Sequence, residues 1–307
     1  MVICLVALPY VQTSVFVDDR YSFGGNQLAT FWDIQSNSQI PTEIMQGIAL
    51  EMNFSETTFF ETSTLDSCSY KVRIFTPARE IPFAGHPTLG SAFVLKHTGL
   101  IDSHATETSL ELGIGKIPVE YITSDSVRMI QPAPKFLKKL DDRKSIAATV
   151  GLPASAISTK YPMQYVATGT PFLIVPLISL AAVQQAQPDG PSILRTLSDE
   201  STAKIVILST ETVNAASDVH VRMFAPDVGV LEDPATGSAA GPIGAYLDYY
   251  GLINRNTRGE PIIIEQGYEI NRPSQLIAKV VGKQKLESVL VSGKIKLVAE
   301  GSFYVDV

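Results

Sequence analysis

The stretch Val72-Arg73-Ile74-Phe75-Thr76-Pro77 has a counterpart later in the chain, Val221-Arg222-Met223-Phe224-Ala225-Pro226. Each copy alternates in the manner of a β-strand and stops at a proline. In both copies a loop of small residues follows, then an apolar stretch that ends at Gly-Leu-Ile, at residues 99–101 and 251–253. A glycine there favours the left-handed backbone that ends helices. Because order and residue identity agree over four successive segments, we predict two related halves.

The apolar stretches, residues 89–98 and 239–250, have almost no polar face, and a helix that is apolar nearly all round is buried. Strand-like segments flank both stretches. We therefore predict an α/β (α+β) fold of two similar pseudo-symmetric domains, each a curled sheet around a central helix, which meet at a cleft. The clearest predicted strands cover residues 10–17, 28–32, 127–130, 172–175, 204–208, 262–265, 276–281 and 294–298.

The predicted boundary between the halves lies after residue 125. We place an N-terminal domain at residues 1–125 and a C-terminal domain at 126–294, with a last strand at about 295–307 that returns to the first domain. The stretch from Pro132 to Leu152 is richer in proline and lysine, and we expect it to hold the linker.

Composition limits the classes of partner. The chain has 307 residues and a net charge of -7, which argues against a broad nucleic-acid surface. No apolar stretch approaches the roughly 18 residues that span a bilayer. The apolar start, Met1 to Tyr10, is short, lacks basic residues and contains Pro9, so a strand fits better than a signal peptide. We expect a cytoplasmic protein with no nucleic-acid and no membrane partner.

Metal and cofactor motifs are absent from the sequence. There are two cysteines, Cys4 and Cys68, no CxxC, and four scattered histidines, so we expect no metal site. The cysteine count allows one disulfide, but free thiols are the expected state in this class of protein. Gly24-Gly25 lacks the spacing of a dinucleotide fingerprint, and GxxxxGK[ST] does not occur. We therefore expect no cofactor.

The loops before the two helices, FAGHPT at residues 83–88 and EDPATGS at 232–238, carry the strongest chemical signal. Proline is tolerated at a helix start. Gly85 and Gly237 allow the backbone to approach a ligand closely. Free N–H groups and the dipole at a helix start form an anion site, and two such starts could hold a carboxylate or an enolate-like oxyanion.

Ordinary helix capping by Asp233, Thr88 and Ser238 is the alternative for these loops. Capping alone would explain a single loop of this kind. Two matching loops favour a functional anion site over capping. His86 is either a hydrogen-bonded structural residue or part of the site, with neither preferred. Asp233 could cap the helix, bond a substrate amine or hydroxyl, or do both.

Glu56 lies among three phenylalanines in NFSETTFF, residues 53–60. It is either a surface residue of an alternating strand or a partly desolvated acid/base whose pKa burial would raise. Composition alone favours the surface position. Arg73 and Arg222 occupy matched strand positions, where a structural ion pair in both halves is favoured over contact with a substrate carboxylate.

These motifs resemble, in order and over almost the whole chain, the PhzF-like family of phenazine-biosynthesis isomerases. The segments that carry the resemblance are FGGN (23–26), NFSET (53–57), FTP (75–77), PFAGHPT (82–88) and EDPATGSA (232–239). The last two are highly specific as a pair. Gly25-Asn26-Gln27 departs slightly from the commoner Gly-Asn-Pro.

The resemblance implies the diaminopimelate-epimerase-like fold with mostly antiparallel sheets. It also implies a cofactor-independent isomerase of a biosynthetic process that acts on a cyclic dihydro-hydroxyanthranilate-type substrate. Glu56 matches the family's proton shuttle, and a homodimer follows only by analogy. The implied catalytic residues are Glu56, His86 and Asp233, and the implied substrate-binding residues are Ser55, Gly85, Thr88, Gly237 and Ser238.

Three other functions are alternatives to an isomerase. Related racemases use two cysteines, one per loop, and the cysteines here lie elsewhere, which disfavours racemisation. A single carboxylate can instead shift a double bond by moving a proton between two carbons on one face. A small-molecule-binding or regulatory protein that kept the cleft but lost turnover stays open. A hydrolase or lyase with Ser238 as nucleophile is disfavoured, because no general base lies at a recognisable spacing.

Overall fold

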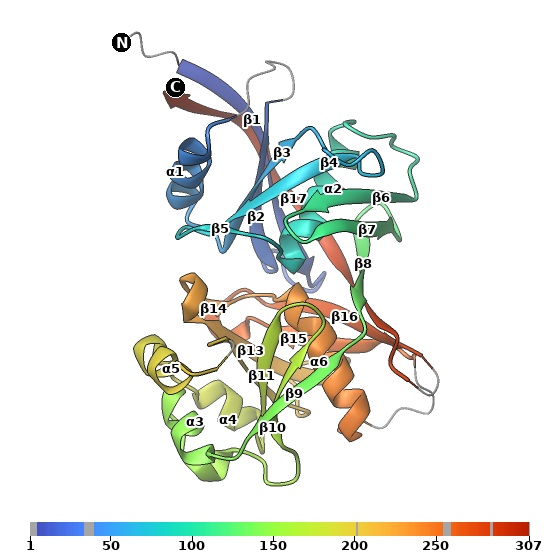
Figure 1. Cartoon of the computed structure of the whole chain (residues 1–307). Coiled ribbons are helices and arrows are strands. Elements are labelled where there is room, and N and C mark those ends of the chain that lie inside the picture. Colours follow the sequence, from blue (N-terminus) through green and yellow to red (C-terminus); the bar gives the residue numbers. More distant parts are fainter. Residues whose placement is uncertain (1–4, 34–39, 201, 254–258, 283–284, 307) are drawn as a thin grey trace. The chain divides into compact units, whose positions relative to one another are not determined.

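The computed structural model describes the chain except residues 1–4, 34–39, 201, 254–258, 283–284 and 307 (Figure 1). The chain divides into two compact units. The first comprises Met1–Val17, Asn26–Met129 and Gly293–Val307, and the second comprises Asp18–Gly25 and Ile130–Ser292. Each unit contains its own strands and its own buried helix, and each is described below by itself.

The first unit is a sheet of mixed direction. Its strands are β1 (Leu5–Val17), β2 (Asn26–Trp32), β3 (Glu56–Glu61), β4 (Tyr70–Phe75), β5 (Glu80–Ile81), β6 (Glu107–Leu112), β7 (Gly115–Tyr121) and the start of β8 (Ser126–Pro132). Neighbouring strands are antiparallel except for the parallel pairs β2/β3 and β4/β6. The last strand, β17 (Ser288–Asp306), runs antiparallel along β1, as the red and blue ribbons show in Figure 1.

Both faces of strand β2 are buried. Ala29 and Phe31 pack in a core with Met45 of helix α1 (Thr42–Met52). Leu28, the residue before Ala29, points to the other face and lies against Gly90 of helix α2 (Gly85–His97). Helix α2 packs against β1, β2, β3, β4 and β6. The sheet of the first unit therefore surrounds α2 on one face and carries α1 on the other.

The second unit has the strands β9 (Lys135–Leu140), β10 (Met163–Ala167), β11 (Pro171–Pro176), β12 (Ile205–Ser209), β13 (Val219–Ala225), β14 (Val230–Asp233), β15 (Ile262–Gln266) and β16 (Ser274–Val281). Its buried helix α6 (Gly237–Tyr250) packs against β10, β11 and β16. Further helices are α3 (Arg143–Thr149), α4 (Leu180–Gln185) and α5 (Gly190–Thr196), with 3-10 turns at Ala154–Ala156, Pro226–Val228 and Tyr268–Ile270.

The succession of strand pairings is the same in the two units. In the first unit β1/β2 is antiparallel, β2/β3 parallel and β3/β4 antiparallel. The short strand β5, which we call the spur, pairs antiparallel with β4. The parallel pair β4/β6 and the antiparallel pairs β6/β7 and β7/β8 follow. From β10 to β17 the succession reads identically, with β14 as the spur and β13/β15 as the second parallel pair. In both units the buried helix follows the spur.

The mixed α/β fold predicted from the sequence is confirmed, and each predicted strand falls within or overlaps a strand of the structure. The helix starts were predicted too late: α2 begins at Gly85 instead of Leu89, and α6 at Gly237 instead of Ala239. Gly85 and Pro87 resemble loop residues in sequence, but a proline fits the first helical turn because the N–H groups there have no helical acceptor.

The linker predicted between Pro132 and Leu152 is wrong, because this stretch folds as β9 and α3. β9 pairs with β10. The Asp142 side chain caps α3 by accepting a hydrogen bond from the Ser145 N–H at 3.0 Å. The lysines that suggested a linker are exposed residues of strand β9. A strand with a solvated face carries such residues as readily as a linker does.

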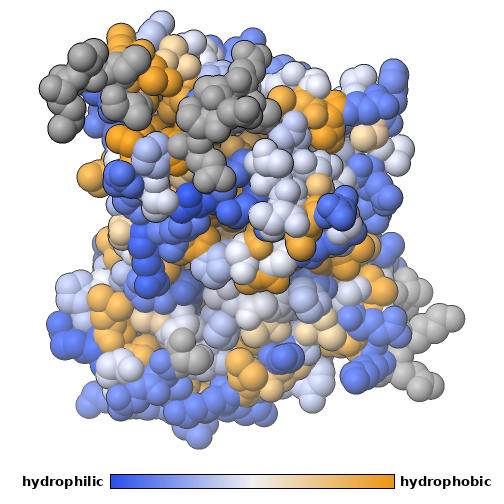
Figure 2. Space-filling view, turned by 45° about the horizontal axis from the view of Figure 1, so that its top comes forward, coloured by the Kyte–Doolittle hydropathy of each residue, from blue (hydrophilic) through white to orange (hydrophobic). Residues whose placement is uncertain are grey.

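The surface carries few concentrated apolar areas on the face shown in Figure 2, where hydrophilic residues surround scattered apolar ones. Among the described residues, no helix combines the length and apolar character needed to cross a membrane. Cys68 is a free thiol. Cys4 lies outside the described residues, so the predicted absence of a disulfide stays a prediction.

Gly90 marks a close approach between α2 and the sheet. A Cβ atom at this position would lie 2.4 Å from Leu28 Cδ2 and 3.0 Å from Val15 Cγ2. Gly90→Ala should therefore lower the free energy of unfolding by about 1 to 3 kcal/mol, as overpacking of a core does. Equilibrium urea denaturation measures the change.

The matched control is Gly47→Ala in the exposed part of α1, where nothing lies within 4 Å of the added methyl group. There the helix propensity of alanine should raise stability by about 0.5 to 1 kcal/mol. Equal effects of the two substitutions would contradict the packing described for α2.

Candidate active site

Glu56 is the first residue of β3, in register with Leu28 of the parallel strand β2. Its side chain is 13% exposed. Phe59 and Phe60, further along β3, are buried. The surface position that composition favoured is therefore wrong, because β3 is covered on both faces whereas simple alternation assumes one solvated face.

His86 is the second residue of α2 and is 3% exposed, with Nε2 3.5 Å from Oε2 of Glu56. Burial lowers the pKa of its imidazole to about 3, and a hydrogen bond to the backbone of Gln27 offsets this effect only in part. Gln27 follows the first residue of β2. The starts of β2, β3 and α2 thus place a neutral imidazole beside a largely buried carboxyl group.

A neutral imidazole suits a neighbour that must change its protonation state. The ring carries one N–H donor and one lone pair, so it can donate to a carboxylate or accept from a carboxylic acid. It has no net charge that would hold Glu56 in the ionised form. The contact is therefore compatible with both states through which a general acid/base passes.

The helix-capping role considered for Thr88 is not observed. Its hydroxyl donates to the Ala84 carbonyl at 2.7 Å, and Ala84, the N-cap of α2, supplies no side-chain hydrogen bond. Ser55 is half-buried and Gly85 is buried at the helix start. Direct contact of Ser55, Gly85 and Thr88 with a substrate stays a prediction.

The second loop joins β14 to α6. Asp233 ends β14 and is 6% exposed, and its Oδ2 accepts a hydrogen bond of 2.6 Å from the Thr236 hydroxyl. The N-cap of α6 is Thr236, which forms no side-chain capping bond. Gly237 and the half-buried Ser238 are the first two residues of the helix, so neither Asp233 nor Ser238 occupies the N-cap position.

Two buried glutamines that the sequence analysis missed hold this second loop. Gln131 donates to the Gly237 carbonyl at 2.9 Å and accepts from the Thr168 hydroxyl at 2.5 Å. Gln266, at the end of β15, bonds both Asp233 and Thr236. They lie far from the loop in sequence, and no local pattern could have identified them.

Arg73 and Arg222 form the structural ion pairs that the sequence favoured, and this prediction is confirmed. Arg73 bonds both carboxylate oxygens of Glu80, at 2.8 and 2.7 Å. Arg222 bonds both oxygens of Glu232, each at 2.8 Å. Such bidentate pairs fix orientation as well as charge. In each unit the pair joins the matched strand to a residue in the segment that leads to the buried helix.

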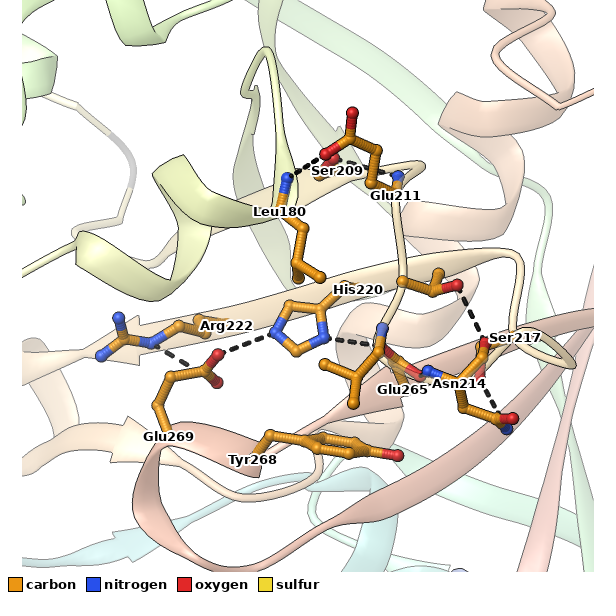
Figure 3. A network of polar contacts seen from close by, with 12 residues as sticks. Leu180, Ser209, Glu211, Asn214, Ser217, His220, Arg222, Glu265, Tyr268 and Glu269 are labelled. Atoms are coloured by element: carbon orange, nitrogen blue, oxygen red, sulfur yellow. Dashed lines mark hydrogen bonds and ion pairs between the residues drawn. The ribbon is translucent and has the colours of Figure 1, made fainter.

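A buried charged histidine lies next to the Arg222 pair. The ring nitrogens of His220 lie 2.7 Å from Oε1 of Glu265 and 2.9 Å from Oε1 of Glu269 (Figure 3). Burial alone would lower its pKa, but hydrogen bonds to the two carboxylates outweigh burial and raise it to about 9. The pKa values of Glu265 and Glu269 are lowered below the usual range by His220, against the effect of burial. Both ring nitrogens are therefore donors at neutral pH.

The described residues do not form a metal site. Within the described part of the chain, no three side chains of His, Cys, Asp or Glu are grouped so that they could hold a metal ion. Both nitrogens of His220 face carboxylates and offer no lone pair while the ring is charged.

Comparison with known proteins agrees with the motifs around these residues. The family described as phenazine biosynthesis-like protein, PhzC-PhzF, matches residues 14–301. The chain belongs to the PhzC-PhzF family. It is 34% identical over 300 residues to the trans-2,3-dihydro-3-hydroxyanthranilate isomerase of Pseudomonas aeruginosa, covering 96% of this chain and 99% of that protein. It is 33% identical over 262 residues to the uncharacterized isomerase YfhB of Bacillus subtilis, covering 84% of each.

Solved structures of the PhzC-PhzF family have the same fold. A Bacillus anthracis phenazine biosynthesis protein of the PhzF family has a TM-score of 0.87 at 25% identity, covering 98% of this chain and 100% of that one. A protein described as a probable proline racemase, from Agrobacterium radiobacter, shows a likeness of fold alone, with 9% identity and a TM-score of 0.63. The match covers 96% of this chain and 92% of that one. The isomerase names among the relatives support isomerase activity for this PhzC-PhzF protein.

The burial of His86 predicts its protonation state. Because its pKa is about 3, the ring should stay neutral from pH 5 to pH 8. Two-dimensional NMR of histidine-labelled protein should show ring signals of His86, assigned with His86→Gln, that do not move over this range. A titration of these signals with a midpoint above pH 5 would contradict the neutral ring beside Glu56.

His220 predicts a pH-dependent contribution to stability. Its pKa is raised from 6.5 in the unfolded chain to about 9, so its contribution is complete below pH 6.5 and is lost as the pH rises through 9. The loss of stability caused by His220→Gln should therefore be largest near pH 6. It should shrink by roughly 2 to 3 kcal/mol by pH 9.5, measured by urea denaturation.

His104→Gln, which removes an exposed ring, is the control for this experiment. Its effect on stability should stay small at every pH. If the loss caused by His220→Gln were constant from pH 6 to pH 9.5, His220 would not be charged in the folded protein.

Proposed function

We propose that this protein is a cofactor-independent isomerase that shifts a proton, and with it a double bond, in a small carboxylated substrate, with Glu56 as the general acid/base. The observation that carries the proposal is the pair formed by the 13% exposed Glu56 and the neutral His86, 3.5 Å apart. The family membership and the isomerase relatives support it.

The proposed step needs one base that later acts as an acid. The Glu56 carboxylate takes a proton from a carbon that conjugation makes acidic, and the electron pair of that C–H bond forms a new C=C bond. The existing double bond moves its electrons one position along, and the far carbon takes the proton back from Glu56. Substrate and product thus have the same atoms and charge, and no oxidant or second reactant enters.

Partial burial of Glu56 favours this reaction. A carboxyl group with little access to water can pass its proton to a bound substrate instead of losing it to solvent. The neutral ring of His86 accommodates both states. We propose that His86 orients a polar substrate group or helps to move charge as the proton is transferred.

The loop before α6 supplies the remaining groups in this proposal. Asp233 would bond an amine or hydroxyl of the substrate, and Ser238 would bond its carboxylate. The N–H groups near Gly85 and Gly237 would stabilise negative charge, since both helices begin without a side-chain bond at the N-cap.

We also infer that the two units arose by duplication of one ancestral unit. The same succession of strand pairings in both, the matched Arg73 and Arg222 pairs, and the buried helix after the spur strand support this inference. Duplication explains why the chain has two similar helix starts, of which one is beside Glu56 and the other beside Asp233.

The relatives suggest the first substrate to test. The Pseudomonas enzyme is named for trans-2,3-dihydro-3-hydroxyanthranilate, a compound with a carboxylate, an amine and a hydroxyl group on an unsaturated ring. We propose a substrate of this class, in which conjugation to the carboxylate stabilises the charge left by proton removal. A panel of cyclic and acyclic amino and hydroxy carboxylates extends the test to other members of the class.

Solvent-deuterium incorporation, followed by mass spectrometry on this panel, tests the role of Glu56. The wild-type protein should place deuterium in at least one compound, and Glu56→Gln should reduce the rate by at least about 100-fold, the usual contribution of general acid/base catalysis. The loss should appear in kcat, because the amide keeps the shape of the side chain.

Glu51→Gln, a change of the same chemistry on the exposed side of α1, should leave the rate unchanged. Deuterium uptake that survives in Glu56→Gln would remove Glu56 from its proposed role. Thermal stabilisation by a compound that never exchanges deuterium would favour a binding or regulatory protein.

A further inference from the structure

We propose that Gln266 and Thr236 are positioning residues that hold the Asp233 carboxylate in one orientation and keep it ionised. They would act through Asp233 and would not touch the substrate. The assignment rests on the proposed function, in which Asp233 binds a polar group of the substrate. The hydrogen bonds around the loop before α6 carry it.

Gln266 is the last residue of β15 and is 1% exposed. Its Oε1 accepts a hydrogen bond of 3.1 Å from the Thr236 N–H. Its Nε2 donates to the Asp233 carbonyl at 2.7 Å and to the Thr236 Oγ1 at 3.0 Å. A flipped amide would place its NH₂ group against an N–H donor and its oxygen against a carbonyl, so the partners allow only this orientation.

The orientation of the amide sets the direction of the next hydrogen bond. A hydroxyl has one hydrogen, and because Thr236 Oγ1 already accepts from Gln266, that hydrogen is available to donate. The acceptor is Oδ2 of Asp233, at 2.6 Å. The hydrogen bonds therefore run in one direction, from the Gln266 amide to the Thr236 hydroxyl and from this hydroxyl to the Asp233 carboxylate. We call this series the relay. A donor to a carboxylate favours its ionised form, and it holds the plane of the carboxylate.

The backbone after Gln266 shows that the strand end and the loop are closely packed. Gly267 has a φ of +82°, and a Cβ atom there would lie 2.6 Å from the Pro234 carbonyl oxygen and 2.3 Å from that of Arg272. Only glycine meets both conditions, the positive φ and the lack of space. The Gln-Gly pair thus brings the amide against the backbone of the loop that carries Asp233.

The charged network of Figure 3 supports both ends of the relay. In the parallel pair of β13 and β15, His220 is opposite Glu265, to which it is hydrogen-bonded, and Gln266 is the next residue. On the other side, Arg222 holds Glu232, the residue before Asp233, through two hydrogen bonds. The neighbours of Gln266 and of Asp233 are therefore both held by side chains of β13.

The test measures the carboxyl pKa of Asp233 by ¹³C NMR of aspartate-labelled protein, with the signal assigned by Asp233→Asn. Thr236→Val removes the donor and keeps the shape of the side chain, whereas Thr236→Ser keeps the hydroxyl. Gln266→Leu removes the donor that fixes the direction of the Thr236 hydroxyl and adds no charge near Asp233. The nearby charged groups Glu232, Arg222 and Glu269 remain in all these variants.

The matched controls lie elsewhere in the same unit. Thr202→Val removes a hydroxyl that donates to a different aspartate, Asp227. Gln164→Leu removes a buried amide that donates to a different backbone carbonyl, that of Leu137. A structural loss common to buried Thr and Gln would appear in these controls as well.

We expect Thr236→Val to raise the pKa of Asp233 by about 1 to 2 units, the effect of losing a hydrogen bond to a charged group, and Gln266→Leu to shift it in the same direction. Thr236→Ser should restore the wild-type value, and the controls should not change it. With a substrate that the wild type converts, the first two variants should lower kcat about 10-fold or more, with the serine variant close to wild type.

A pKa of Asp233 that is the same in Thr236→Val as in Thr202→Val would overturn the proposal. If Thr236→Val does not fold, Thr236→Ala decides by the same comparison with Thr202→Ala. The NMR measurement needs no substrate, so it separates the two proposals. Failure of the wild type to exchange deuterium would count against the proposed function, whereas an unchanged pKa would count against the relay.

Discussion

A helix that begins inside a protein leaves its first backbone N–H groups without helical acceptors, and this constraint governs both units. The starts of α2 and α6 are buried, and neither has a side-chain hydrogen bond at its N-cap. An unpaired buried N–H group costs about 1 to 3 kcal/mol, so such a start is tolerated where polar or anionic groups can reach it. The residues proposed to take part in the reaction, Glu56 and His86 in one unit and Asp233 in the other, lie beside these starts.

The loops that lead to the helices depend on ion pairs made by arginines of the preceding strands. Arg73 joins β4 to Glu80, and Arg222 joins β13 to Glu232. The Arg222 pair is buried, so loss of one partner there would leave an uncompensated charge, whereas Glu80 is 41% exposed and water screens the Arg73 pair. Each ion pair therefore disfavours other registers of the short strands β5 and β14. The register of each strand sets the residue at which the following loop begins.

The sequence predicted what is encoded locally. The paired strands, the loops and the glycines after each helix are visible because each depends on a few adjacent residues. The helix starts were placed too late because Pro87 and its neighbours have loop-like composition. Burial of Glu56 could not be predicted, since it needs α1 and α2 on opposite faces of the sheet. Gln266 and Gln131 reach the loop from 30 and 106 residues away, and such contacts leave no periodic signal.

The two buried histidines show why geometry must decide which residue does the chemistry. His220 has a carboxylate at each ring nitrogen and a pKa of about 9, so at neutral pH it can only donate. His86 is buried without such compensation, and its pKa falls to about 3. The same side chain is thus a fixed cation in one place and a neutral donor and acceptor in the other. In the proposed reaction Glu56 must pass between its two protonation states, and the neutral ring of His86 can accept from the acid or donate to the carboxylate.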